Sequence, residues 1–236
     1  MKSKKNARAR AAGLAFLIVA AGGLAIDAAL AEDGGYTAPP KGFQITWKRT
    51  IRDGGKVTSD TVIHRITASK GDEVIYKVVE KGGDEVRLLR GIFSYAYWRP
   101  DEGWAEYKFD KARIRGLWPL KAGKEANVAM NFGYGVAKTE AAARQKWAHS
   151  ETGIILYKVL RHETVTVPAG TFDTVVIQRD RSFTKLADKK TEGHRRTAWF
   201  APSLGYVVKQ VIVYEPNNPK SRATTIEAVK IERPGK

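Results

Sequence analysis

The sequence predicts a mainly β protein: a single curved antiparallel sheet or half-open β-barrel, with at most one or two short helices after an N-terminal export signal. Runs rich in β-branched and aromatic residues recur from residue 43 almost to the end of the chain. Glycine-rich turn signals separate these runs at short intervals. Such connections suit antiparallel neighbours and are too short for the crossovers of a parallel sheet.

The first element expected is a secretory signal peptide over residues 1–31. A basic head of Lys2, Lys4, Lys5, Arg8 and Arg10 precedes an uncharged apolar run, residues 11–26, and the small residues of "ALA" end at Ala31. We predict cleavage after Ala31. The alternative is a retained membrane anchor, but the run is near the short limit for spanning a bilayer and is rich in alanine and glycine.

The export signal and the absence of cysteine together limit where the protein can reside and how it can be stabilised or anchored. The sequence contains no cysteine, so we expect a periplasmic protein of a Gram-negative cell that carries neither disulfides nor the acyl anchor of a lipoprotein. Residues 32–42, "EDGGYTAPPKG", predict a flexible leader. No linker or repeat divides the chain after Gly42, so residues 43–234 are predicted to form one domain, and a monomer is favoured.

The first half of the domain has the pattern of a meander. Turn signals fall near residues 53, 70, 82 and 101, and a β-rich run lies between each pair. The segment 116–135 contains Pro119 and several glycines, and it is predicted to be loop-rich with one or two short strands. Residues 139–150 contain "EAAARQ", which favours a short helix, although a strand remains open.

The second half returns to hairpins, of which "VTVPAGTFDTVVI", residues 165–177, is the clearest. Pro168 presets φ for the first turn position, and Gly170 can adopt a positive φ. A proline–glycine turn of this kind joins two strands in register. The "APSLG" stretch, residues 201–205, is interpreted in the same way, so both turns are predicted to shape the sheet and not to form an active site.

Three blocks in this order resemble the exported bacterial domain-of-unknown-function 3108 family. They are "WPLKAGK" at residues 118–124, "ETVTVPAGTFDTVVI" at residues 163–177 and "TAWFAPSLGYVVKQ" at residues 197–210. The resemblance covers about the C-terminal half of the chain. It implies an envelope protein with a strongly curved antiparallel sheet, similar to the half-barrels of lipoprotein carriers, and it supplies no catalytic residue.

No catalytic, metal or cofactor site is predicted. The four histidines show no ligand spacing, and the chain lacks a G-x-S-x-G elbow and a cysteine nucleophile. The paired acids at residues 72–73, 84–85 and 101–102 stand at predicted turns, where solvated charge is ordinary. We therefore expect a non-enzymatic protein without a cofactor.

Aromatic residues are the candidates for ligand binding. In "GIFSYAYWRP" aromatic side chains alternate with small ones, and a second aromatic group lies in the C-terminal hairpin. Tyrosine and tryptophan can line an apolar groove with their polar tips exposed. The alternative is that they pack the core. The predicted site residues are Tyr95, Tyr97, Trp98, Trp104, Trp199, Tyr206 and Arg99.

The net charge fits two interpretations equally well, an anionic partner or a charge that only keeps the protein soluble. Without residues 1–31 the chain has 41 − 5 = 36 basic and 25 − 1 = 24 acidic residues, a net charge of +12. For an exported protein the expected anions are lipid phosphates and cell-wall polymers, not nucleic acid. The arginines that could bind an anionic head group are Arg87, Arg90, Arg99, Arg195 and Arg196, although they suit a solvated face equally well.

The predicted function is therefore the binding of an amphipathic anionic ligand, a lipid or glycolipid, in the concave face of the sheet. The alternative is a structural module that binds an envelope protein or cell-wall polymer through a flat face. A hydrolase or metal-dependent enzyme is the third interpretation.

Overall fold

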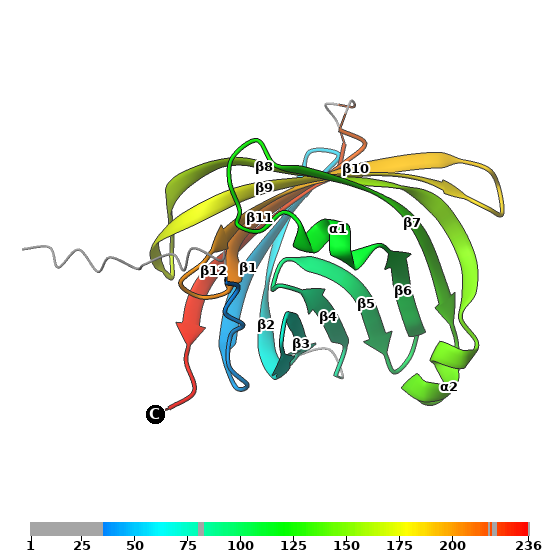
Figure 1. The fold of residues 1–236 in the computed structure, drawn as a ribbon, viewed down its shortest axis with the longest axis horizontal. Coiled ribbons are helices and arrows are strands. Elements are labelled where there is room, and N and C mark those ends of the chain that lie inside the picture. The colour runs from blue at the N-terminus through cyan, green and yellow to red at the C-terminus, as the bar shows by residue number, and fades with distance from the viewer. Residues whose placement is uncertain (1–34, 80–82, 217, 219–220, 236) are drawn as a thin grey trace, which may run out of the picture.

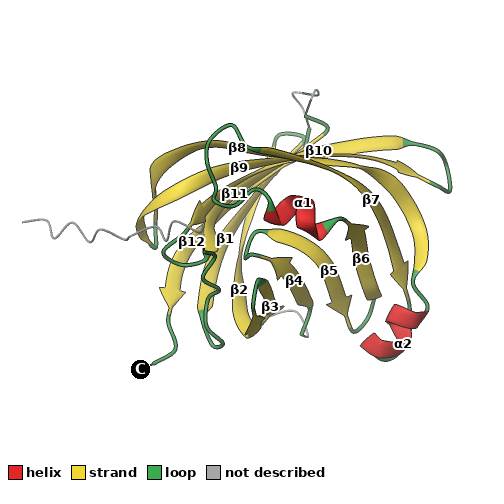
Figure 2. Ribbon diagram, in the orientation of Figure 1, coloured by secondary structure: helices red, strands yellow, loops and turns green. Residues whose placement is uncertain are grey.

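The computed structural model describes residues 35–79, 83–216, 218 and 221–235. The predicted signal peptide, residues 1–31, lies outside the described residues. Regular structure is almost entirely strand, with two short helices in the described part of the chain (Figure 2). The mainly β prediction is confirmed, and so is the limit of two helices.

Twelve strands succeed one another in the described chain. The first six are β1 (Gln44–Asp53), β2 (Lys56–Lys70), β3 (Glu73–Val78), β4 (Glu85–Leu89), β5 (Phe93–Arg99) and β6 (Gly103–Phe109). The others are β7 (Glu125–Gly135), β8 (Ala148–Val167), β9 (Gly170–Lys185), β10 (Thr191–Ala201), β11 (Tyr206–Tyr214) and β12 (Ala223–Glu232). The long strands β7 to β10 arch over the short strands β3 to β6 (Figure 1).

The sheet is a closed barrel, which corrects the expected open sheet or half-open barrel. Consecutive strands pair antiparallel throughout, and β1 also pairs with β12, from Gln44 opposite Glu232 to Arg52 opposite Ala223. This pairing joins the two ends of the domain. Patterns within a run predict local hairpins but carry no signal for a contact between such distant segments.

The segment 116–135 also differs from its prediction. Its second part is one strand, β7, in which buried and exposed residues alternate: Ala126, Val128 and Met130 are buried, whereas Glu125, Asn127 and Ala129 are exposed. Alternation of this kind is the signature of a half-buried strand. The small and polar residues on the outer face concealed it in the sequence.

Both helices have identifiable caps. α1 (Lys111–Arg115) begins after Asp110, whose carboxylate accepts a hydrogen bond from the amide of Ala112. α2 (Glu140–Gln145) begins after Thr139, whose hydroxyl accepts from the amide of Ala142. The helical alternative for "EAAARQ" is thus confirmed, while residues from Ala148 onward belong to β8.

The proline–glycine hairpin is confirmed. Val167 pairs with Gly170 across the turn between β8 and β9, and Gly170 has a φ of +134°. Because an L side chain rarely adopts such a φ, glycine is required here. The turn connects two long strands and contributes no group to the candidate site.

The interior of the barrel is largely filled by one hydrophobic cluster. It includes the buried rings of Trp47, Tyr157 and Tyr206 and the buried Ile114 of α1. In Figure 1, α1 lies between the long strands and β5. The inner face is thus apolar over most of its area, and polar inward-facing side chains are the exceptions that need an explanation.

The described part of the predicted leader, residues 35–42, is packed against the barrel. The Tyr36 hydroxyl donates to the carbonyl of Gly205 at 3.1 Å, and the Ser69 hydroxyl donates to the carbonyl of Pro39 at 2.6 Å. The ring of Tyr36 meets Trp118 edge to face at 6.3 Å. These contacts pack residues 36–39 against the barrel.

Replacement of Gly205 by alanine tests this attachment. Gly205 has a φ of +63°, and a Cβ there would clash with the carbonyl oxygen of Thr37. Gly71 has a similar φ of +58° with open space around it, so Gly71→Ala reports the backbone strain alone, about 1–2 kcal/mol. We expect Gly205→Ala to lower the free energy of unfolding by at least about 1 kcal/mol more than Gly71→Ala in urea titrations. Equal losses would show that the leader contributes nothing.

Candidate functional site

A pocket of about 510 Å³ opens at the end of the barrel where β5 turns into β6. Aromatic side chains form most of its wall. Its lining residues are Tyr97, Arg99, Glu102, Gly103, Trp104, Ala105, Tyr107, Phe132 and Tyr134. We call this the mouth pocket.

Strand register places the aromatic wall on the inner face. Tyr97 of β5 pairs with Ala105 of β6, and Tyr107 pairs with Phe132 of β7. Side chains of directly paired residues share a face, and residues two apart on one strand do so as well. The rings of Tyr107 and Phe132 are 4.6 Å apart between centroids, and those of Tyr97 and Tyr107 are 6.2 Å apart.

The charge at the rim of the mouth pocket is already balanced. Arg99 forms an ion pair with Glu102 and lies 3.5 Å from a carboxylate oxygen of Asp84. Both of these carboxylates belong to the chain itself. Arg99 is therefore a weaker candidate for an anionic head group than the sequence suggested.

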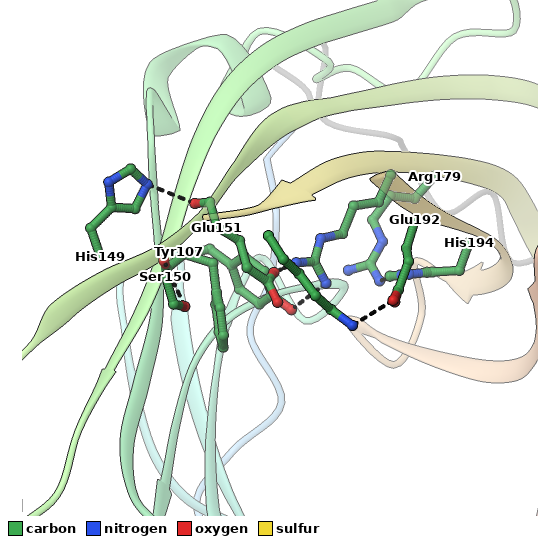
Figure 3. A network of polar contacts seen from close by, with 10 residues as sticks. Tyr107, His149, Ser150, Glu151, Arg179, Glu192 and His194 are labelled. Carbon is green, nitrogen blue, oxygen red and sulfur yellow. Dashed lines mark hydrogen bonds and ion pairs between the residues drawn. The ribbon is translucent and has the colours of Figure 1, made fainter. Parts of the chain in front are cut away.

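A polar network lies behind the aromatic wall (Figure 3). Arg181 of β9 donates to the Tyr107 hydroxyl at 3.0 Å and forms an ion pair with Glu151 of β8. Its guanidinium also lies 3.9 Å from the ring centroid of Phe183. Arg181 is thus a buried cation with a carboxylate partner.

A second arginine, the half-buried Arg179 of β9, has no carboxylate partner among the described residues. Its guanidinium lies 2.7 Å from Nε2 of His194 (Figure 3). A guanidinium only donates, so this histidine nitrogen accepts and the imidazole is neutral. Burial, together with the positive charge of Arg179, lowers the pKa of His194 to about 3, which is consistent with that assignment.

Arg196 of β10 completes the cluster. Burial lowers its pKa, and repulsion from Arg179 lowers it further. Tyr157, Arg179 and Arg196 border a small cavity of about 10 Å³, which Ile92, Phe93, Ile177 and Ala198 complete. We call Arg179 and Arg196 the inner arginine pair.

The structure brings together only some of the predicted site residues. Tyr97, Arg99 and Trp104 line the mouth pocket. Trp104 is also buried beneath α2, where the guanidinium of Arg144 lies 4.0 Å from its ring, and Trp98 pairs with it across the strands.

The remaining predicted site residues lie elsewhere. Tyr95 is buried, with the ammonium of Lys111 3.7 Å from its ring. Tyr206 is 1% exposed and packs in the core near Trp47 and Phe43. Trp199 donates its indole hydrogen to Glu163 and neighbours Lys209. These three contribute nothing to the mouth pocket.

Sequence reasoning missed Tyr107, Phe132, Arg179 and Arg181. Tyr107 lies in β6 and Phe132 in β7, and the alternation of inward and outward side chains along these two strands did not enter the prediction. The arginines of "QRDRSF", residues 178–183, had a signal: Arg179, Arg181 and Phe183 continue the inward alternation of the buried Val175 and Ile177. A charged residue that falls in the same alternation as buried apolar residues is expected to point into the interior.

No group of histidine, aspartate and glutamate that could hold a metal ion occurs among the residues described. Neither α1 nor α2 is long and apolar enough to cross a membrane.

His64 of β2 is a further polar ring on the inner face, and it is half-buried. It stacks on Tyr76 with ring centroids 4.1 Å apart, and its Nδ1 has no hydrogen-bond partner in the described chain. Burial, with smaller contributions from Arg196 and Arg49, lowers the pKa of His64 to about 3. The ring is therefore neutral in the folded state down to that pH.

Histidine protonation should weaken the fold in acid. Between pH 6.5 and pH 3 the unfolded chain binds a proton at His64 that the folded chain does not, so stability falls as pH falls, by at most about 1.4 kcal/mol per unit. We expect His64→Phe, which keeps the stack, to lose melting temperature less steeply over this range. Parallel pH profiles of the two proteins would contradict the assignment.

Comparison with solved structures gives remote similarity to several bacterial proteins. The hypothetical lipoprotein YmcC from Escherichia coli aligns over 82% of this chain and 85% of its own, with 10% identity and a TM-score of 0.46. A protein from Bacteroides fragilis with a YmcC-like fold aligns over 84% and 99%, with 15% identity and a TM-score of 0.46. A LolA superfamily protein from Nitrosomonas europaea aligns over 86% and 91%, with 9% identity and a TM-score of 0.27.

A search of curated proteins found no significant match. The model of the DUF3108-like family matches residues 106–220, a segment that runs from β6 to beyond β11 and contains the three sequence blocks. The resemblance to the domain-of-unknown-function 3108 family is thereby confirmed over residues 106–220.

Proposed function

We propose that this protein is an exported, non-enzymatic envelope protein that binds an amphipathic anionic ligand, a lipid or glycolipid, at the mouth of its barrel. The mouth pocket is the observation that carries the proposal. It is of the size of a small-molecule site, and aromatic side chains dominate its wall.

The wall suits a ligand with an apolar body. Tyr97, Tyr107 and Phe132 supply ring faces on the inner side of three adjacent strands. Tyrosine hydroxyls keep a polar tip, so the same wall can accommodate both an acyl chain and the polar groups next to it. Tyr134 is 54% exposed at the entrance and extends the apolar surface toward solvent.

Positive charge supports an anionic ligand. The chain without residues 1–31 has a net charge of +12, and such a field attracts anions to the surface. Arg196 of the inner arginine pair also lies within electrostatic range of Tyr97, a residue of the pocket wall.

Periplasmic location is part of the proposal. It rests on the basic head, the apolar run and the "ALA" sequence before residue 32. Anchoring by acylation is not proposed, because the sequence has no cysteine to carry the acyl chains.

Obstruction of the mouth pocket provides the test. Ala105 faces the pocket between Tyr97 and Tyr134, its partners on the two neighbouring strands. Ala105→Phe should fill the space and weaken binding of a fluorescent fatty acid at least about tenfold. Ala129→Phe places the same ring on the exposed outer face of β7 and should leave binding unchanged.

The native ligand can be sought in parallel. Mass spectrometry of organic extracts should find a lipid with wild-type protein purified from its host, and less of it with Ala105→Phe. The proposal fails if wild-type protein carries no lipid and binds neither fatty acid nor anionic vesicles. Capture of an envelope protein or cell-wall polymer in that case would favour the interaction module instead.

A further inference from the structure

The charges across β9 and β10 differ sharply between the two faces of the sheet. Arg195 is paired with Asp180 on the outer face, and their side chains form an ion pair at 2.6 Å. One residue along, Arg196 is paired with Arg179 on the inner face. Like charges directly opposite one another in a sheet are destabilising.

The chain offers the inner arginine pair no counter-charge within its described part. No ion pair joins Arg179 or Arg196 to a carboxylate of the described residues, and the Nε of each lacks a hydrogen-bond partner there. Glu151, a half-buried acid of β8, pairs with Arg181.

The other groups around Arg196 are neutral or positive. Its guanidinium lies within electrostatic range of the hydroxyl groups of Tyr76, Tyr97 and Tyr157, and the positive charge of Arg179 repels it. His64 and His194 lie within range of the same charge, and both rings are neutral. The pocket around Arg196 therefore has an excess of positive charge.

This arrangement contrasts with the other arginines that the sequence suggested. Arg87 pairs with Glu85 and Glu140, Arg90 lies 3.7 Å from Asp72, Arg99 pairs with Glu102, and Arg195 pairs with Asp180. Arg196 is the member of that group without a carboxylate in the described chain. A guanidinium does not release its proton, so burial cannot neutralise it.

The space beside the pair limits what can bind there. The cavity of about 10 Å³ is close to the volume that one water needs, so a carboxylate or phosphate enters only if the side chains that line it move apart. Tyr97 lines the mouth pocket and also lies within electrostatic range of Arg196. Tyr97 therefore links the mouth pocket to the surroundings of the inner arginine pair.

We propose that Arg179 and Arg196 bind a compact oxyanion, a carboxylate or a phosphate, that forms the end of the ligand held in the mouth pocket. This inference rests on the proposed function and specifies which end of the ligand enters the barrel. The planar fork of each guanidinium can donate two hydrogen bonds to such a group. The anion supplies the charge that the described chain lacks.

Calorimetric titration with matched amphiphiles tests the inference. Dodecanoate and dodecanol share a chain and differ in the head group. Wild-type protein should bind dodecanoate at least about tenfold more tightly than dodecanol, as expected for loss of charge-assisted hydrogen bonds. Arg196→Gln should remove that preference. Arg195→Gln, the outward neighbour, should retain it.

Stability measurements give an independent readout. Without ligand, Arg196→Gln should melt at the same temperature as wild type or higher, because it removes repulsion between two guanidinium groups. With dodecanoate, the order should reverse. If Arg196→Gln does not fold, Arg179→Gln and the wild-type comparison of dodecanoate with dodecanol decide the question.

Each outcome separates the two proposals. Equal affinity for dodecanoate and dodecanol, or undiminished dodecanoate binding by Arg196→Gln, overturns the head-group site and leaves the mouth pocket standing. Stabilisation by acetate or inorganic phosphate that depends on Arg196, without binding of either amphiphile, supports an oxyanion site for a free anion and overturns the lipid-binding function. Absence of every effect overturns both.

Discussion

The pairing of β1 with β12 is the constraint on which the molecule depends. It converts a meander into a closed barrel, so that every strand has two neighbours and every inward side chain faces the same interior. Closure decides which residues are buried together. It also gives the barrel a defined mouth, where the aromatic wall of β5, β6 and β7 meets solvent.

The interior combines two kinds of surface with different energetic consequences. Most of it is an apolar core that stabilises the fold by burial. The polar part consists of Arg181 with Glu151, and the inner arginine pair of Arg179 and Arg196. An unpaired buried charge costs roughly several kcal/mol. Arg179 and Arg196 are only half-buried, but they face each other without a carboxylate partner in the described chain, and anion binding is the purpose that we propose for this arrangement.

Local patterns predicted much of the fold. Turn residues such as Asp53, Pro168 and Gly170 act over a few positions, so the hairpins could be inferred without tertiary information. Barrel closure could not, because the contact between Gln44 and Glu232 depends on the accumulated twist of all the strands between them.

The candidate site was predicted less completely, for a physical reason. Aromatic residues serve as core filler and as groove lining alike, and only the register of neighbouring strands separates Tyr206 in the core from Tyr97 in the mouth pocket. The charge of an arginine is equally ambiguous until its partners are known. Arg195 and Arg196 are adjacent in sequence, yet one pairs with Asp180 outside and the other faces Arg179 inside.

The central claim is that this inner pair binds a ligand oxyanion. A crystal structure of the protein with dodecanoate tests it most directly: the account predicts the carboxylate within hydrogen-bond distance of Arg179 and Arg196 and the chain among Tyr97, Tyr107 and Phe132. Dodecanoate bound elsewhere, or a carboxylate of the protein paired with Arg196, would contradict it.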